Sequence, residues 1–342
     1  MKIKKKIALI FGVTGQDGSY LAELLLKKGY NVHGVKRRTS IPNTNRVDHI
    51  FDSINFSSKY FHLHHGDLSD SGSLYRIINK VNPDEIYNLA AQSHVKISFQ
   101  IPEYTSDVNA LGTLRILEII RHYKRKKIKF YQASSSEMYG KSKPPQNEKT
   151  IFQPRSIYAV SKVFAYHSVV HYREAYNVHA CNGILFNHES PRRGVNFVTK
   201  KIIQGLLRIK NKKQKILVLG NLYSKRDWGH ARDYVEAMWK MMQQKRPDDY
   251  VIATGKTITI KEFVNKAAKK IGFKIRWAGK GINEKAINIE NNKSIIECKK
   301  RYFRPVEVDY LKGNAQRAKK ILKWSPKTSI DNLIDEMIQH EL

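Results

Sequence analysis

The sequence predicts an α/β protein built on a doubly wound parallel sheet, followed by a smaller C-terminal α/β lobe. Three observations support this fold class. Apolar runs of strand length alternate with helical patterns through residue 133. A glycine-rich turn directly follows the first apolar run. The chain has 342 residues, 41% of them hydrophobic, which is enough for one large core and a second, smaller one.

The first strand is expected at residues 7–11, a continuous apolar run typical of a parallel strand buried on both faces. A Gly-x-x-Gly-x-x-Gly turn and an amphipathic helix over residues 20–28 follow. This is a Rossmann-type unit, in which glycines let the backbone approach a diphosphate and the helix start meets its charge. The expected cofactor residues of the turn are Gly12, Thr14, Gly15, Gln16, Asp17 and Gly18.

A basic and hydroxylic segment ends the second expected strand, residues 31–35. An acidic residue at this place usually holds the adenosine ribose, whereas this chain has Lys36 followed by Arg37, Arg38, Thr39 and Ser40. Two guanidiniums and two hydroxyls suit a 2′-phosphate. The segment therefore favours NADP over NAD, with a solvated charge run as the alternative.

Three more strands are expected at residues 60–65, 85–89 and 128–133, with helices at 73–81 and 107–124 between them. Ligands of such sheets bind at the carboxyl ends of the strands. Asp67 follows the third strand and is expected to contact the adenine edge, and residues 90–94 form the loop beneath a bound cofactor. Because His62, His64 and His65 have no partner at metal-ligand spacing, no metal is expected.

Tyr158 and Lys162 carry the most explicit chemistry in the chain. On a helix they share one face, about 6 Å apart along the axis, and a nearby cation favours a phenolate that can take a proton from an alcohol. The spacing alone is common on helices, and a tyrosine beside a solvated lysine is the ordinary alternative. A Ser-Ser-Ser-Glu segment at residues 134–137 strengthens the catalytic interpretation, because it follows the fifth strand.

The C-terminal half has a looser pattern. A sixth strand is expected at residues 180–186, polar residues follow at the same rim, and later elements are expected at 199–210, 215–219, 231–243, 251–254, 260–271 and 329–341. We expect residues 1–186 to form a cofactor domain and residues 187–342 to form most of a substrate lobe. Residues 222–246 are expected to return to the first domain.

Bulk composition limits the function classes. The formal net charge is +32, but the basic residues are scattered and no nucleic-acid-binding signature accompanies them, so no specific nucleic acid partner is expected. Two cysteines, Cys181 and Cys298, cannot form a disulfide framework. No apolar run reaches the ~20 residues of a membrane span, and the basic N-terminus lacks a cleavage site. A cytoplasmic protein without membrane contact is expected.

Longer motifs resemble the extended short-chain dehydrogenase/reductase family, and within it the sugar-nucleotide 4,6-dehydratases. The resemblance runs nearly end to end, through residues 12–18, 35–38, 88–94, 102–105, 180–194, 225–237 and 303–309. It implies that Tyr158 is the base for the sugar 4-hydroxyl and that Lys162 holds the nicotinamide ribose. It implies that Glu137 handles the C5 and C6 protons. Ser135 stands where this family usually has threonine, and it keeps the hydroxyl for the 4-oxygen.

The resemblance also implies binding residues and partners. To the cofactor site it adds Leu68, Leu89, Ala90, Ala91, Gln92, Ser93, Tyr104, His188 and Arg193. The residues implied for a GDP-sugar are Asn187, Lys201, Arg226, Arg304 and Glu307, with Arg304 suited to the diphosphate and Glu307 to a ribose hydroxyl. A homodimer or homotetramer is implied.

The implied activity is that of a lyase that dehydrates a GDP-sugar and uses bound NADP twice. Oxidation at C4 acidifies the C5 proton, Glu137 removes this proton as water leaves C6, and the stored hydride returns to C6. GDP-mannose and the one-carbon-longer GDP-manno-heptose are alternative substrates. A sugar-nucleotide 4-epimerase or reductase and a non-enzymatic anion-binding protein are the alternatives from other classes, but an epimerase needs no counterpart of Glu137.

Overall fold

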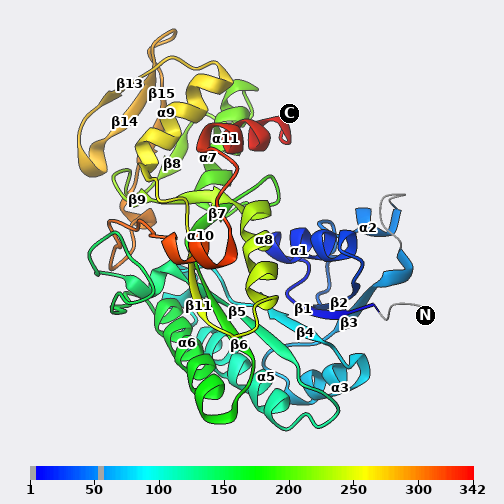
Figure 1. Cartoon of the computed structure of the whole chain (residues 1–342). Helices are drawn as coiled ribbons and strands as arrows, with labels where there is room; N and C mark the ends of the chain where they lie inside the picture. Colours follow the sequence, from blue (N-terminus) through cyan, green and yellow to red (C-terminus); the bar gives the residue numbers. More distant parts are fainter. Residues whose placement is uncertain (1–4, 53–57) are drawn as a thin grey trace.

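The computed structural model describes residues 5–52 and 58–342 and confirms the α/β class (Figure 1). Its centre is a seven-stranded parallel sheet in the order β11-β6-β5-β4-β1-β2-β3. Because the strand order reverses between β1 and β4, the sheet has a topological switch point where ligands bind in such folds. Its strands are β1 (Ile7–Phe11), β2 (Asn31–Lys36), β3 (Phe61–His65), β4 (Glu85–Asn88), β5 (Lys129–Ser135), β6 (Ala180–Leu185) and β11 (Asp249–Ile252).

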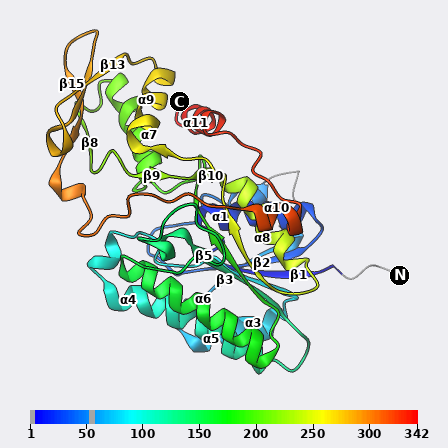
Figure 2. The same cartoon turned by 60° about the vertical axis from the view of Figure 1, so that its left-hand side comes forward.

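Helices cover both faces of this sheet (Figure 2). Side chains alternate along β1, so that Ala8 and Ile10 join one core and Leu9 and Phe11 join the other. This explains the unbroken apolar run, because a strand covered on both faces has no solvent side. The first core contains α1 (Gln16–Lys27), α8 (Ala231–Met242) and α10 (Gln316–Leu322), and the second contains α3 (Ser71–Val81), α5 (Gly112–Arg121) and α6 (Ile157–Tyr176).

A second lobe has its own apolar core around a four-stranded sheet in the order β13-β14-β15-β8. Its strands are β8 (Leu217–Leu219), β13 (Ile275–Ala278), β14 (Lys285–Asn288) and β15 (Ser294–Cys298), and its helices are α7 (Val198–Lys210), α9 (Ile260–Ile271) and α11 (Ile330–Gln339). Two short strand pairs form in the same half of the chain, β7 (Asn187–Glu189) with β10 (Trp228–His230) and β9 (Lys225–Arg226) with β12 (Ile258–Thr259). The remaining α-helices are α2 (His49–Asp52) and α4 (Pro102–Ser106).

Several expected boundaries were wrong. The helix expected at residues 107–124 is helical from Pro102, contains a π-helical turn at Asp107–Leu111 and ends at Arg121. Within that turn, the Asn109 side chain hydrogen-bonds to the backbone of Gln92, a partner that no local pattern shows. The strands β13, β14 and β15 were not predicted, and β11 pairs with β6 in the main sheet although its residues lie outside the segments expected to belong to the first domain.

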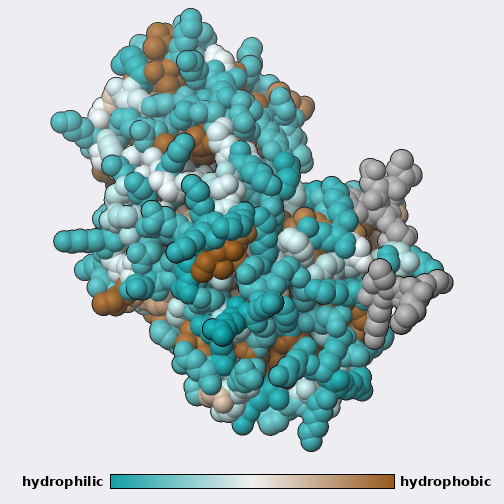
Figure 3. All heavy atoms as spheres, viewed as in Figure 1, coloured by the Kyte–Doolittle hydropathy of each residue, from teal (hydrophilic) through white to brown (hydrophobic). Residues whose placement is uncertain are grey.

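The surface agrees with the strongly polar composition. The face drawn in Figure 3 is mainly hydrophilic, with small and separate hydrophobic patches. Within residues 5–52 and 58–342, no helix combines the length and the hydropathy that crossing a membrane requires.

Candidate active site

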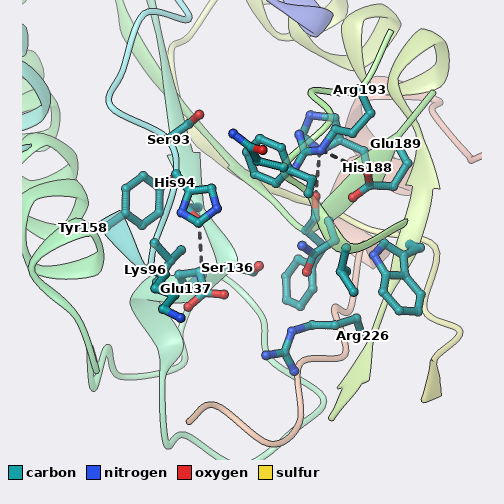
Figure 4. Close-up of a pocket in the computed structure, with 18 of the residues that line it drawn as sticks. Ser93, His94, Lys96, Ser136, Glu137, Tyr158, His188, Glu189, Arg193 and Arg226 are labelled. Atoms are coloured by element: carbon teal, nitrogen blue, oxygen red, sulfur yellow. Dashed lines mark hydrogen bonds and ion pairs between the residues drawn. The ribbon is translucent and has the colours of Figure 1, made fainter. Parts of the chain in front are cut away.

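A cavity of about 710 Å³ lies at the carboxyl ends of β4, β5 and β6 (Figure 4). Residues of the sheet domain, including Tyr158 and Glu137, form one wall, and residues from α7, β9 and the segment before α10 form the other. The predicted site residues that line it are Asp17, Leu89, Ala91, Ser93, Ser135, Glu137, Tyr158, Lys162, Asn187, His188, Arg193, Lys201, Arg226, Arg304 and Glu307. Strand ends and a second lobe thus meet in one site, as the fold class predicts.

The expected catalytic side chains come from two neighbouring elements. Ser135 ends β5, and its Oγ accepts a hydrogen bond from the backbone N–H of Glu137 at 3.2 Å, which begins a short 3₁₀ turn. Tyr158 lies in the first turn of α6, whose N-cap Ser156 accepts a hydrogen bond from the Ala159 N–H. Lys162 follows one turn later, and its Nζ donates to the Ala133 carbonyl at 2.8 Å.

The electrostatics of the Tyr158–Lys162 pair differ from the expectation. Burial raises the pKa of Tyr158 to about 12, while a hydrogen bond with Ser135 opposes the rise and the charge of Glu137 adds to it. Burial lowers the pKa of Lys162 to about 8. The sequence predicted that the lysine would favour the phenolate, but Nζ lies 6.0 Å from the centre of the tyrosine ring. Desolvation outweighs a cation at that distance.

The glycine turn joins the cavity through Asp17 and the start of α1. Gly12 has φ +79°, and a Cβ there would lie 2.8 Å from the Ala90 nitrogen, so the position requires glycine. The N-cap residue of α1, Gly15, provides no side-chain cap. Asp17 Oδ2 lies 2.7 Å from His188 Nε2. Although burial opposes it, the charge of Asp17 raises the pKa of His188.

Other expected cofactor residues lie outside the cavity lining. Arg37 Nη1 donates to the Tyr104 hydroxyl at 2.5 Å, which brings together two residues predicted from separate segments. Arg38 and Ser40 are exposed, and Asp67 accepts hydrogen bonds from Ser69. The remaining predicted cofactor residues that do not line the cavity are Gly12, Thr14, Gly15, Gln16, Gly18, Thr39, Leu68, Ala90 and Gln92. Of these, Leu68 is a buried core residue packed against Gly112.

Two arginines on the second wall have different environments. Arg226 is 7% exposed, its one side-chain hydrogen bond among the described residues goes to the Lys225 carbonyl, and it forms no ion pair within that part of the chain. Burial lowers its pKa. Arg304 Nη1 instead lies 3.4 Å from both carboxylate oxygens of Glu137. Glu307 Oε1 accepts a hydrogen bond from the Arg304 backbone, and the buried Asn187 Oδ1 has no hydrogen-bond partner among the described residues.

Several further lining residues, among them His94, Lys96 and Tyr302, were not among the predicted site residues. Lys96 donates to the Arg301 carbonyl, and Lys201 lies 3.7 Å above the ring of Tyr302. His94 accepts a hydrogen bond from the Ile97 N–H and packs against Phe197. His94 belongs to the loop expected beneath the cofactor, and Tyr302 directly precedes a recognised motif, but neither has a local pattern that assigns a role.

Comparison with known proteins agrees with this geometry. A family model described as GDP-mannose 4,6 dehydratase matches residues 9–337. The chain belongs to this family. A GDP-mannose 4,6 dehydratase from Drosophila melanogaster is 54% identical and aligns with 99% of this chain and 87% of its own length. The enzyme of the same name from Sinorhizobium fredii is also 54% identical, over 99% of this chain and 97% of its own length.

Solved structures extend the likeness at the level of the fold. A dTDP-glucose 4,6-dehydratase from Bacillus anthracis in complex with NAD aligns with a TM-score of 0.79 at 22% identity, covering 98% of this chain and 96% of that one. A UDP-glucose 4-epimerase from Thermus thermophilus in complex with NAD aligns with a TM-score of 0.77 at 21% identity, with 98% of each chain covered. Dehydratases and epimerases share this architecture, so the fold by itself does not separate them. The membership in the GDP-mannose 4,6-dehydratase family confirms the resemblance read from the sequence motifs.

Proposed function

We propose that this chain converts GDP-D-mannose to GDP-4-keto-6-deoxy-D-mannose and water, with a tightly bound NADP as a recycled hydride carrier. One observation carries the proposal for the site: a phenol, a hydroxyl and a carboxylate, from Tyr158, Ser135 and Glu137, line a single cavity with the buried Arg226, which forms no ion pair within residues 5–52 and 58–342. The first three groups suit alcohol oxidation and elimination, and the arginine suits a diphosphate. Relatives that carry this activity as their name are about 54% identical to the chain.

The residues present fit a dinucleotide cofactor. α1 has 12 residues and starts without a side-chain cap, so the amides of its first turn are available to a diphosphate. Arg37, Arg38, Thr39 and Ser40 would hold the 2′-phosphate of NADP, and Lys162 would hold the nicotinamide ribose. When bound, the oxidised nicotinamide supplies a reversible hydride acceptor and a positive charge.

Tyr158 takes the proton of the sugar 4-hydroxyl, which the Ser135 hydroxyl orients. Because burial raises the pKa of this phenol to about 12, proton removal requires a positive charge near the ring. Lys162, whose pKa burial lowers to about 8, is still mainly protonated at neutral pH and provides part of that charge. Glu137 then removes the C5 proton that the new 4-ketone has acidified, and water leaves from C6.

The substrate is held from the second wall. Arg226 binds the diphosphate, because its guanidinium has no carboxylate partner in the described residues and an anion would compensate its burial. The buried Asn187 Oδ1, which lacks a hydrogen-bond partner in the described part of the chain, would accept a hydrogen bond from the substrate. Lys201 and Glu307 line the same wall and complete the proposed GDP-sugar contacts.

A self-associating surface is proposed on the helices beside the active site. Leu111, Val160 and Phe164 are each more than 40% exposed, and the last two lie one turn apart on α6. Contact with a second copy would cover these side chains, which supports a homodimer or homotetramer. Light scattering measures this state directly, and a monomer at micromolar concentration would contradict it.

Incubation with GDP-mannose followed by mass spectrometry tests the reaction. Loss of one water is expected for a dehydratase, whereas an unchanged mass with an inverted C4 would indicate an epimerase. No conversion despite GDP binding would indicate an anion-binding protein. A parallel incubation with GDP-manno-heptose decides between the two sugars, and faster turnover of the heptose would replace GDP-mannose as the substrate.

A further inference from the structure

A buried ammonium in the first turn of α7 lies outside the groups used so far. Lys200 is 4% exposed. Its Nζ donates a hydrogen bond to the Pro191 carbonyl at 2.7 Å and forms an ion pair with a carboxylate oxygen of Glu341. A buried ammonium with a carbonyl as its one partner is strongly unfavourable, whereas an ion pair with further hydrogen bonds compensates the lost hydration. Glu341 therefore makes the burial of Lys200 possible.

Glu341 is itself held against α7. It follows α11, and its second carboxylate oxygen accepts a hydrogen bond from Gln204 Nε2 at 2.8 Å. Lys200 and Gln204 are four residues apart and share one face of the helix. Although burial opposes it, the hydrogen bonds from these two side chains lower the pKa of Glu341, so its carboxylate is charged at neutral pH. The segment after α11 is thus bound to the start of α7.

Lys200 holds the central peptide of a turn in the loop that follows β7. The Arg193 N–H donates to the Ser190 carbonyl at 3.0 Å, which makes residues 190–193 a β-turn with Pro191 at the position that proline favours. The carbonyl that Lys200 binds belongs to the central peptide of this turn. Because turn types I and II differ by the rotation of that peptide, a buried cation on its carbonyl fixes the turn that ends in Arg193.

The same helical turn also holds the Arg193 side chain. Thr199 Oγ1 donates to Glu189 Oε2 at 2.6 Å, and this buried carboxylate oxygen lies 3.0 Å from Arg193 Nε. Figure 4 shows Arg193 and Glu189 beside each other at the cavity. The first turn of α7 therefore constrains the backbone before Arg193 through Lys200, and the Arg193 guanidinium through Thr199.

The neighbouring Lys201 belongs to a different wall. Its Nζ donates to the Val218 carbonyl at 2.6 Å and lies above the ring of Tyr302, and it lines the cavity, whereas Lys200 does not. Successive side chains of a helix point about 100° apart, so one turn of α7 contacts the loop with Lys200 and the proposed GDP-sugar wall with Lys201. A change at Lys200 is therefore expected to act on the loop.

We propose that Lys200 and Glu341 are positioning residues for the cofactor: their ion pair holds the Pro191 carbonyl, and the turn fixed in this way places Arg193 against NADP. This inference rests on the proposed function, with Arg193 as the cofactor contact that the sequence motifs imply. Neither Lys200 nor Glu341 lines the cavity, so the pair acts through the loop and not by contact with a ligand. Its loss is expected to weaken NADP binding and to leave GDP binding nearly unchanged.

Calorimetric titrations of NADP and of GDP into the full chain, freed of bound nucleotide, test this inference. Glu341→Gln is expected to weaken NADP binding about five- to tenfold and GDP binding less than about twofold, because Lys200 stays buried but loses the charge that compensates it. Lys200→Met removes the buried charge, so the chain is expected to fold, and NADP binding should weaken to a similar degree because the Pro191 carbonyl loses its donor. Lys200→Arg keeps a cation and its donors and should bind NADP within about threefold of the parent.

Two further variants separate positioning from general stability. Asp335→Asn on α11 is the matched control, because it removes an ion pair with Lys270 at the surface and should change neither affinity. In the Lys200→Met background, Glu341→Gln should weaken NADP binding by less than about twofold further, since the partner is already lost.

Three results would overturn the inference while the proposed function stands. They are parental NADP affinity in either Glu341→Gln or Lys200→Met, equal losses of NADP and GDP affinity, and full additivity in the double variant. A parent chain that binds GDP but no NADP would instead refute the cofactor of the proposed function, and the inference with it.

Discussion

Replacing Arg226 with methionine is expected to stabilise the unliganded protein and to weaken GDP binding. Arg226 is 7% exposed, and within the described residues its guanidinium makes one hydrogen bond, to a backbone carbonyl, and forms no ion pair. Replacing a buried charge with an apolar side chain of similar length often stabilises a protein by about 1–4 kcal/mol. Attraction to Glu137, Glu307 and Asp309 already compensates part of the burial, so we expect about 1–2 kcal/mol.

The expected change in Tm follows from the length of the chain. An unfolding entropy of about 2.1 cal/mol/K per residue over 342 residues gives about 0.7 kcal/mol/K, so the gain corresponds to about 1–3 °C. At least one charge-assisted hydrogen bond to the diphosphate, about 1.5–3 kcal/mol, is lost, which weakens GDP binding about 10- to 150-fold.

Calorimetric unfolding without ligand and GDP titration measure both effects. Arg304→Met is the comparison variant for stability, because it removes the ion pair with Glu137 and is expected to lower the free energy of unfolding by about 1 kcal/mol. An Arg226→Met protein that unfolds at a lower temperature and binds GDP as well as the parent would refute the reasoning, since Arg226 would then be a structural residue.

Three further predictions concern the reaction, the cofactor and stability. Tyr158→Phe should leave bound NADP unreduced after substrate is added. Glu137→Gln should instead accumulate NADPH and a 4-keto sugar that keeps its C6 oxygen, because elimination is slowed ~10²–10⁴-fold. Near-parental release of 6-deoxy product by the Glu137→Gln enzyme would remove Glu137 from the mechanism. Neutral replacements of Arg37 and Arg38 should weaken NADP binding by about 1–3 kcal/mol per lost contact and leave NAD binding unchanged, so equal losses would argue against a 2′-phosphate site. Burial, with repulsion from His62 and His64, lowers the pKa of His33 to about 4 in the folded protein. The neutral imidazole therefore contributes its full stabilisation above the pKa of the unfolded chain, about 6.5, and this stabilisation is lost as the pH falls toward about 4. His33→Gln should therefore reduce the acid loss of unfolding free energy by about 1–2 kcal/mol after discounting for partial exposure, and an unchanged pH dependence of Tm would contradict this.

Much of the architecture was predictable because its signals are local. The apolar run of β1, the glycine turn and α1 occupy adjacent residues, and burial on both faces requires the run to be apolar throughout. α9 was predicted with its observed bounds, Ile260–Ile271. In the structure a capping box of Thr259 and Glu262 begins it, and Gly272 ends it in the left-handed region, both of which are local signals. The strands β13, β14 and β15 were missed because each has only four or five residues, too few for a clear periodicity.

In the functional site, too, some features follow from local sequence and others from the packing of distant segments. The sequence alone determined which chemical groups are present, since Tyr158 and Lys162 are one helical turn apart and Ser135 and Glu137 follow a strand end. Only the tertiary structure decided how these groups behave. Burial raises the pKa of Tyr158, whereas the lysine was expected to lower it. Arg304 meets Glu137 across 167 residues of chain, while Arg226 forms no ion pair among the described residues. Desolvation and contacts between distant segments depend on how the two lobes pack around the cavity, and no local pattern encodes them.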